Sequence, residues 1–366
     1  MALRIAHLLP STDVGGRERI VADLCRTAPA YGIDPLILTY DRPSEGTGID
    51  FGDTQVVALD RRRSDFGAAL TALLAERRID LLHAQGHVAA ALARGVSVPY
   101  VATLHVALGT GWRWLLPIAR GLRGASAVTA VSGDLARRYA RIALRRVETV
   151  PTGVDIDHFT PARLTGEGPF TIGIVARLHP VKRHCDALAA MRMLRARGVF
   201  FRLLLAGDGP ARAAVARAAA GLDVEMLGSI DCVAELLQRL DAFLLCSDHE
   251  GTPAALLEAM AAGLPCVATR VGGIPAVAEG AALLVPPRSP AAIADALERL
   301  AVDPYKRARL GAAARERAGA FSIDRQARAY AELYASLLSA EPVTSSAPAL
   351  RPWSGGAPRL RRTGSS

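Results

Sequence analysis

The sequence predicts an α/β protein built from two doubly wound domains that face each other across a cleft. Short apolar runs alternate with amphipathic helical stretches, a pattern typical of parallel sheets with helices on both faces. A stretch rich in Pro, Gly and Thr interrupts this alternation near the middle of the chain. The length of 366 residues exceeds one ordinary core and suits two domains of about 100–200 residues each.

Seven candidate strands precede that interruption. They are Arg4–Leu9, Pro35–Thr39, Gln55–Leu59, Leu81–Ala84, Tyr100–Leu104, Ala127–Ala130 and Val147–Val150. Helical patterns lie between them, at Glu18–Tyr31, Asp65–Arg77 and Ser132–Ala143. We therefore expect an N-terminal domain over residues 1–155.

The chain pattern breaks at Pro151–Gly153 and again across Pro161–Pro169, and a second alternating series then begins. Its candidate strands are Thr171–Val175, Arg202–Ala206, Val224–Leu227, Ala242–Cys246, Pro265–Ala268 and Ala282–Val285. These predict a C-terminal domain over residues 156–320, with ligands beyond the carboxyl ends of the strands. Residues 340–366 have the composition of a disordered basic tail.

The net charge of +9 is almost entirely arginine, since Lys182 and Lys306 are the only lysines among 44 basic residues. No basic–aromatic platform or nucleic-acid motif accompanies it, so we expect no nucleic-acid partner. The five cysteines are scattered without metal-ligand spacing, which indicates reduced, buried thiols of a cytosolic protein. No apolar run reaches about 18 residues, which predicts a cytoplasmic protein without a signal peptide or membrane span.

The segment Asp248–Pro265 carries the sharpest local pattern. Thr252 is a good N-cap, Pro253 suits the first helical position, and Gly263 supplies the C-terminal stop. A short helix is therefore predicted over Pro253–Ala262, directly after a strand.

The start of this helix would leave the amides of Ala254 and Ala255 unpaired, beside small side chains that let a ligand approach. Such an N-terminus is an anion site, worth about 0.3–1 kcal/mol from the helix dipole. Glu250 and Glu258 flank it rather than sharing a helix face, so they suit binding of hydroxyls. The alternative is an ordinary strand–helix turn with solvated glutamates.

Arg177 and Lys182 follow the first strand of the second domain, where a ligand of a parallel sheet would lie. A diphosphate needs cations, and charge-assisted hydrogen bonds contribute roughly 1.5–3 kcal/mol each. A lysine in a chain that nearly always uses arginine indicates a need for a compact point charge. Taken alone, this pair is better explained by chance.

Glycines follow two other strands. Gly15 and Gly16 open a helix and can form an amide nest, although glycine turns open many helices. Gly207 and Gly209 also follow a strand, but Arg212 stands where a dinucleotide fingerprint needs Gly or Ala. That loop is therefore interpreted as a structural turn, which disfavours a nicotinamide dehydrogenase.

His105 ends a first-domain strand and so lies at the predicted cleft, where it could bond a sugar hydroxyl or balance charge. A histidine satisfied within the core is the alternative. His83 and His87 are four residues apart without a nearby acidic ligand, and Asp155 and Asp157 lie at the domain hinge. We assign no metal to any of them.

Taken in order, these segments resemble the retaining family 4 glycosyltransferases of GT-B fold, over almost the whole chain to about Leu338. The matching motifs are Gly15-Gly16-x-Glu18, Thr103-x-His105, Val150–Asp155, the Arg177/Lys182 spacing, Ala206–Pro210, Glu250-x7-Glu258, Val271–Pro275 and Leu284–Pro287. Each motif is modest, but their joint order is specific.

The resemblance implies a nucleotide-diphosphate sugar as donor, transferred with retention of configuration and without a metal or other cofactor. The catalytic residues that it implies are His105, near the reaction centre, and Glu250, on the donor sugar. The donor-binding residues that it implies are Gly15, Gly16, Arg177, Lys182, Gly251, Thr252, Ala254, Ala255 and Glu258. It also places a last helix, at about 321–339, back across the first domain.

Three departures from the family pattern leave the donor sugar open. Ala176 and Arg183 stand where glycine is usual around the Arg/Lys element. Thr252-Pro253 replaces the commoner aromatic-glycine pair after the first glutamate.

The acceptor is expected to be a glycan or a lipid-linked saccharide of polysaccharide or glycolipid synthesis. Gly111–Arg123 mixes two tryptophans with arginines and could rest on an anionic membrane, with Arg61–Arg63 assisting. The location would then be peripheral, on the inner face of the cytoplasmic membrane. A solvated basic face is the alternative. Two rival functions also stay open: a GT-B-like epimerase or phosphorylase, and a nucleotide-sugar-binding subunit without catalysis.

Overall fold

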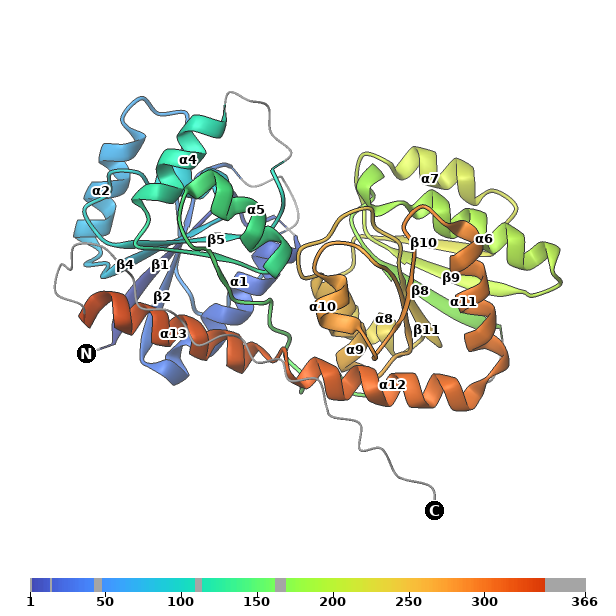
Figure 1. Ribbon diagram of the computed structural model, residues 1–366. Coiled ribbons are helices and arrows are strands. Elements are labelled where there is room, and N and C mark those ends of the chain that lie inside the picture. The colour runs from blue at the N-terminus through green and yellow to red at the C-terminus, as the bar shows by residue number, and fades with distance from the viewer. Residues whose placement is uncertain (1, 14, 43–47, 109–113, 162–168, 340–366) are drawn as a thin grey trace, which may run out of the picture.

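The computed structural model of the protein describes residues 2–13, 15–42, 48–108, 114–161 and 169–339. Two α/β units lie side by side, each a parallel sheet with helices on both faces (Figure 1). This confirms the predicted fold class. Each predicted strand is found within two residues of its expected bounds. The expected tail at 340–366 lies outside the described residues.

The first unit contains a seven-stranded sheet in the order β3-β2-β1-β4-β5-β6-β7. Its strands are β1 (Leu3–Leu9), β2 (Ile33–Thr39), β3 (Val56–Ala58), β4 (Leu81–Gln85), β5 (Tyr100–Leu104), β6 (Ala127–Ala130) and β7 (Glu148–Thr149). Its helices are α1 (Gly16–Thr27), the 3₁₀ turn η1 (Ala28–Tyr31), α2 (Phe66–Glu76), α3 (His87–Leu92), α4 (Leu115–Gly124) and α5 (Gly133–Ala143).

The second unit contains a six-stranded sheet in the order β10-β9-β8-β11-β12-β13. Its strands are β8 (Phe170–Val175), β9 (Phe201–Ala206), β10 (Val224–Gly228), β11 (Ala242–Leu245), β12 (Cys266–Thr269) and β13 (Leu283–Val285). Its helical elements are η3 (Pro180–Lys182), α6 (His184–Ala196), α7 (Arg212–Ala219), α8 (Val233–Leu237), α9 (Ala254–Ala261), α10 (Ile274–Ala278), α11 (Pro290–Val302) and α12 (Pro304–Gly319).

The strand order of both sheets places their ligand-binding loops. In each sheet the chain winds outward in one direction, returns to the middle and then winds outward in the other. The reversal falls between β1 and β4 in the first sheet and between β8 and β11 in the second. Loops that follow these strands diverge, and the crevice between them is where doubly wound sheets bind ligands. The predicted site segments follow β1, β5, β8 and β11.

The last helix, α13 (Ile323–Ser339), leaves the second unit and packs against the first, beside α1 (Figure 1). Its Tyr330, Leu333 and Tyr334 join an apolar cluster with residues of β1, β4 and β5. The two segments that connect the units run side by side, since Val154 and Ser322 form a parallel bridge. Two chain segments therefore connect the units, and they are hydrogen-bonded to each other.

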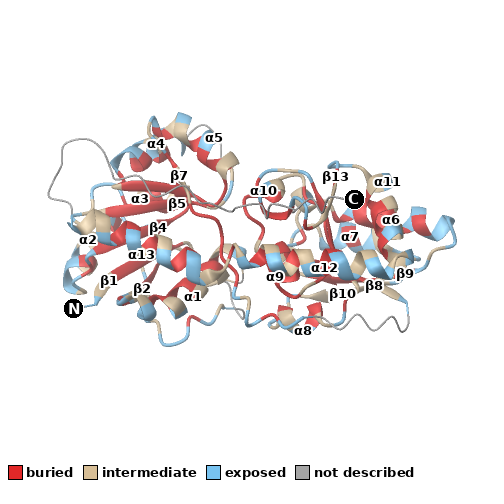
Figure 2. Cartoon of the chain, turned by 60° about the horizontal axis from the view of Figure 1, so that its bottom comes forward, coloured by how far each residue is buried: buried red, intermediate tan, exposed pale blue. Residues whose placement is uncertain are grey.

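Burial follows the layers: the central strands are largely buried, the edge strands β3, β7 and β10 are not, and the helices turn one face to solvent (Figure 2). One face of the first sheet packs on α2–α5 with Ala and Leu side chains. The other face, under α1 and α13, carries apolar residues and a row of buried polar ones, among them His7, His83, Gln85 and Thr103. Within the described residues, no helix combines the length and the apolar character needed to cross a bilayer.

The cysteine prediction is partly wrong. All five cysteines are free, and Cys25, Cys246 and Cys266 are buried. Cys185 is exposed and Cys232 only half-buried, because both lie at helix starts rather than in strands.

Two helical glycines give a test of the close packing of α3 on α4. A Cβ at Gly121 of α4 would lie 2.8 Å from the Cα of Ala91 in α3, and backbone cannot give way cheaply. Gly121→Ala should therefore lower the free energy of unfolding by about 1–3 kcal/mol. Gly67 of α2 has open space around it, so Gly67→Ala should raise that free energy by about 0.4–1 kcal/mol. Urea unfolding of both variants checks this, and equal effects would contradict the packing.

Candidate active site

Two of the predicted site residues form a partly buried ion pair in the second unit. Lys182 Nζ lies 2.6 Å from Glu250 Oε1, and the Ser247 hydroxyl donates to the same oxygen at 2.6 Å. Glu250 is only 9% exposed, so this carboxylate meets little water. The structure thus brings together a cation from the loop after β8 and a carboxylate from the loop after β11.

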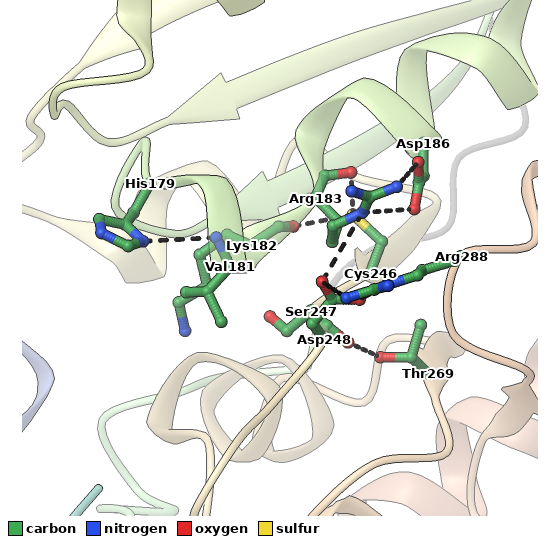
Figure 3. A network of polar contacts seen from close by, with 10 residues as sticks. All are labelled: His179, Val181, Lys182, Arg183, Asp186, Cys246, Ser247, Asp248, Thr269 and Arg288. Carbon is green, nitrogen blue, oxygen red and sulfur yellow. Dashed lines mark hydrogen bonds and ion pairs between the residues drawn. The ribbon is translucent and has the colours of Figure 1, made fainter. Parts of the chain in front are cut away.

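The Lys182 loop is fastened to the β11 loop by backbone contacts (Figure 3). The Asp248 amide donates to the Val181 carbonyl at 2.8 Å, and the Cys246 thiol donates to the Lys182 carbonyl at 3.3 Å. His179 caps the η3 turn, since its Nδ1 accepts from the Val181 amide at 3.3 Å. The turn that contains Lys182 is therefore held in place by hydrogen bonds.

The departure at Arg183 has a visible compensation. Its φ of 53° lies in the left-handed region, which explains why glycine suits this position. The guanidinium of Arg183 makes two hydrogen bonds to Asp186, at 2.9 and 2.8 Å. Asp248 in turn accepts two hydrogen bonds from Arg288, at 2.9 and 3.0 Å (Figure 3). Charge pairing therefore holds a backbone shape that glycine would adopt without strain.

Arg177 lies apart from the ion pair. Its side chain is exposed, and it has no ion-pair partner within the described ranges. A Cβ at Gly209 would lie 2.5 Å from the Leu178 carbonyl oxygen, so the Gly207–Pro210 turn packs directly on the Arg177 loop. The Gly207–Pro210 turn therefore supports the Arg177 loop, which agrees with its interpretation as a structural turn.

The predicted N-cap at Thr252 is wrong. Helix α9 begins at Ala254, with Pro253 in the N-cap position and no side-chain cap. The Thr252 hydroxyl donates instead to the Val131 carbonyl of the first unit, because the two units meet at this point. The amides of Ala254 and Ala255 are thereby left without a side-chain acceptor, as an anion site requires.

Gly251 allows the units to approach closely beside the predicted catalytic histidine. A Cβ at Gly251 would lie 2.6 Å from the His105 carbonyl oxygen. A Cβ at Gly273 would likewise lie 2.8 Å from Ser132 Cβ, at the start of α5. The loop after β11 therefore rests on the ends of β5 and β6, and no larger residue fits there without movement.

The start of α1 holds the carboxylate of Glu18, which the sequence analysis named within a motif without assigning it a role. Glu18 is buried, its carboxylate lies next to Gly15, and Arg17 Nε donates to its Oε1 at 2.8 Å. Gly16 is exposed at the first helical position. The Gly15–Gly16 turn is thus in place after β1, but an acidic group already occupies its helix N-terminus.

Glu258 lies on α9 at the contact between the units. It is 7% exposed, and Arg19 of α1 lies 3.9 Å from its carboxylate. Burial raises the pKa of Glu258 to about 7, and the Arg19 charge opposes this only in part. This carboxyl therefore exists close to half protonated near neutral pH.

His105 is held from inside the first unit. Its Nε2 lies 2.8 Å from Oε1 of Gln85, the last residue of β4. Burial, with a smaller effect of the Arg17 charge, lowers the pKa of His105 to about 3. A neutral ring favours hydrogen bonding over charge balance as its role.

Gln85 was missed by sequence reasoning because its partner His105 lies at the end of a different strand. The one sequence signal for Gln85 was its position as a polar residue at the carboxyl end of a predicted strand. Ser247 and Arg17 bond to the nearby carboxylates of Glu250 and Glu18, and no residue pattern distinguished them. Within the described ranges, no three His, Cys, Asp or Glu side chains gather as a metal site.

Two doubly wound units that meet at the carboxyl ends of their strands, with a cation and a helix start on one side, define the class of GT-B enzymes. The comparisons with known proteins agree with this class. Residues 14–158 match the model described as Glycosyltransferase Family 4, and residues 169–303 match that of Glycosyl transferases group 1. The chain belongs to this glycosyltransferase family and is a nucleotide-sugar-dependent transferase.

Several curated relatives cover most of the chain. It is 30% identical over 392 aligned positions to the D-inositol 3-phosphate glycosyltransferase of Frankia alni, covering 89% of this chain and 96% of that protein. It is 28% identical over 300 residues to the putative glycosyltransferase EpsF of Bacillus subtilis, covering 72% and 78%. A GDP-mannose-dependent phosphatidylinositol dimannoside mannosyltransferase of Mycobacterium tuberculosis is 32% identical over 221 residues, covering 57% of each chain.

Solved structures share the fold at low identity. HepE of Anabaena, in complex with UDP-glucose, superimposes with a TM-score of 0.79 at 20% identity, covering 91% of this chain and all (100%) of that one. A sucrose-phosphate synthase of Thermosynechococcus elongatus gives 0.76 at 21% identity, covering 93% and 100%. These likenesses establish the two-unit architecture.

The raised pKa of Glu258 predicts a pH-dependent stability. Between pH 4.5, its ordinary pKa, and about 7, the folded state binds more protons at this site than the unfolded state. The free energy of unfolding should therefore fall as pH rises through this window, by up to about 3 kcal/mol. Glu258→Gln should lose this fall. Denaturant unfolding from pH 4.5 to 8 measures it, with the exposed Glu279→Gln as control, and an unchanged slope in Glu258→Gln would contradict the assignment.

Proposed function

We propose that the protein transfers a hexose from a nucleotide-diphosphate sugar to a glycan or lipid-linked saccharide, with retention of configuration and without a metal. The observation that supports this most strongly is the Lys182–Glu250 pair beside the free amides of α9. One cation, one carboxylate and a helix start converge at the strand reversal of the second sheet. Diphosphate and sugar hydroxyls need these three groups together.

The pair suggests how the donor is received. When a diphosphate reaches the α9 amides, it competes with Glu250 for the Lys182 ammonium. Glu250, still bonded to Ser247, is then free to accept hydrogen bonds from hydroxyls of the donor sugar. Arg177, exposed at the same edge, adds a second cation. The charge that develops on the leaving diphosphate is stabilised by groups already in place.

The proposed chemistry is attack by the acceptor on the same face of the sugar that the diphosphate leaves. The bond from the anomeric carbon to the diphosphate oxygen breaks as the bond to the acceptor oxygen forms. The departing phosphate takes the acceptor's proton, so no separate side-chain base is required. His105, neutral and 2.8 Å from Gln85, serves as a hydrogen-bonding group beside this centre.

A lipid-linked acceptor is supported by exposed apolar side chains after β5 and at the start of α4; residues 111–113 of the predicted membrane segment lie outside the described residues. Val106 is 55% exposed, and Leu115 and Leu116 at the start of α4 are 44% and 55% exposed. Arg120 and Arg123 share the outward side of α4 with Leu116 at helical spacing. An apolar and basic helix face is typical of binding to anionic membranes. Arg61 and Arg63 pair with Asp41 and Asp65, so they add less to this surface.

Substitution of single lysines tests the donor site, because the chain has only two lysines, Lys182 and Lys306. Uridine, guanosine and adenosine diphosphate sugars should be screened for a rise in melting temperature, which identifies the donor. Lys182→Ala should abolish that rise and lower turnover on the order of 10²–10³-fold, because the leaving diphosphate loses its paired cation. Glu250→Gln should reduce turnover similarly.

Lys306→Ala, on α12 in the second unit, is the matched control and should keep wild-type turnover and melting shift. Product analysis separates the rivals. Free nucleotide released without an acceptor indicates an epimerase-type reaction, consumption of phosphate a phosphorylase, and binding without any turnover a non-catalytic subunit. Full activity in both Lys182→Ala and Glu250→Gln would overturn the proposed site.

The membrane surface is tested by flotation with vesicles. Vesicles that contain phosphatidylglycerol should carry the protein upward, while pure phosphatidylcholine vesicles should not. Arg120→Glu with Arg123→Glu should weaken this binding about tenfold or more, since each arginine contributes about 1 kcal/mol near an anionic surface. Arg217→Glu with Arg309→Glu, exposed on the second unit, makes the same charge change as a control. Protein that stays at the bottom with both vesicle types would exclude the membrane proposal.

A further inference from the structure

A row of polar side chains crosses one face of the first sheet and ends at His105. Because side chains alternate along a strand, residues two apart lie on the same face. His7 on β1 pairs in register with His83 on β4, and Gln85 and Thr103 continue the row toward the carboxyl edge. Helix α13 covers this face. Each member except His105 is at least nine-tenths buried.

The inner part of the row is fully hydrogen-bonded. His83 Nδ1 lies 2.6 Å from the Tyr334 hydroxyl, and His83 Nε2 lies 2.6 Å from the Thr103 hydroxyl. Thr103 also contacts the hydroxyls of Thr129, at 2.6 Å, and Tyr330, at 3.0 Å. These contacts fix α13 on the sheet and leave His83 without freedom to rotate.

The outer part of the row decides the protonation of His105. Gln85 Nε2 lies 3.1 Å from His7 Nδ1, and Gln85 Oε1 lies 2.8 Å from His105 Nε2. An amide nitrogen donates only, and an amide oxygen accepts only. With its nitrogen directed to His7, Gln85 presents an acceptor to His105, which must therefore carry its proton on Nε2.

The other ring nitrogen of His105 is left as an acceptor without a partner. Nδ1 is buried and has no hydrogen-bond partner among the described residues. Buried acceptors in native proteins are nearly always paired, so this nitrogen requires a donor from a bound ligand or from water. The charged and titratable groups near this ring are Arg17 of α1 and His83 of β4, and neither provides a hydrogen bond to Nδ1.

We propose that Gln85 is a positioning residue, which holds His105 in the Nε2–H tautomer so that Nδ1 accepts a hydrogen bond from a substrate hydroxyl. This inference rests on the proposed function. An amide suits the task because it does not titrate, so the proton acceptor that it presents to His105 does not change with pH. A carboxylate at position 85 would accept the same proton but would favour a charged imidazole.

The tautomer can be measured directly, without catalysis. Histidine labelled with ¹⁵N gives distinct shifts for protonated and unprotonated ring nitrogens, and the His105→Asn variant identifies the His105 signals by their loss. We expect Nε2 protonated and Nδ1 unprotonated in the wild type, and a mixture of both tautomers in Gln85→Leu. A wild-type proton on Nδ1, or no change in Gln85→Leu, would overturn the role of Gln85.

Kinetics provide the second readout. Gln85→Leu should lower kcat about 10–100-fold with little change in KM for the donor, since a mixture of tautomers weakens a contact at the reaction centre. Gln85→Glu should restore most of kcat at high pH. Because its carboxylate raises the His105 pKa, activity should fall as pH drops through that raised value. Gln238→Leu, which removes a glutamine bonded to the Thr160 carbonyl in the second unit, should have wild-type kinetics.

The two measurements distinguish failure of the role proposed for Gln85 from failure of the proposed function. If Gln85→Leu does not fold, Gln85→Glu and the wild-type spectrum still decide the tautomer and its pH dependence. If the wild type transfers sugar but Gln85→Glu has a wild-type pH profile, the positioning role is wrong and the proposed function stands. If the wild type transfers no sugar from UDP-glucose, GDP-mannose or the other donors screened, the proposed function is wrong. The ¹⁵N spectrum then decides by itself whether Gln85 sets the tautomer of His105.

Discussion

The structure depends on one topological constraint: both sheets are parallel and reverse their winding in the middle. Because all strands of a sheet end at the same edge, every loop that follows a strand meets its neighbours there. The reversal separates the loops of the two central strands, so polar groups can gather at that edge without breaking the sheet. Lys182 and Glu250 meet at the reversal of the second sheet, while Gln85 is the last residue of β4, which borders the reversal of the first.

The contact between the units has the same origin. The loop after β11 rests on the ends of β5 and β6 through Gly251 and the Thr252 hydroxyl, while Arg19 and Glu258 face each other alongside. Small residues and one buried carboxyl thus lie where the sheets approach. The cost of burying Glu258 is visible as its raised pKa, and a bound hydroxyl or a positive charge would offset that cost.

Polar groups buried in the first unit connect its fold to its chemistry. The hydrogen bonds of His83 with Tyr334 and Thr103 fix α13 to the sheet, and the same face then supplies Gln85 and His105 at its edge. Helix α13 is therefore part of the support for a residue at the proposed reaction centre. Rigid support of this kind keeps a hydrogen-bonding group in one orientation.

The sequence by itself determined the order and bounds of the strands, the fold class and the loops that carry the site, because alternation of apolar runs and turn residues is a local signal. It also located Lys182, Glu250 and His105 at strand ends. Tertiary structure alone decided the partners: Thr252 bonds to the Val131 carbonyl, Glu250 pairs with Lys182, and Gln85 bonds to His105. These contacts join segments far apart in the chain, and no local pattern specifies which loops will meet.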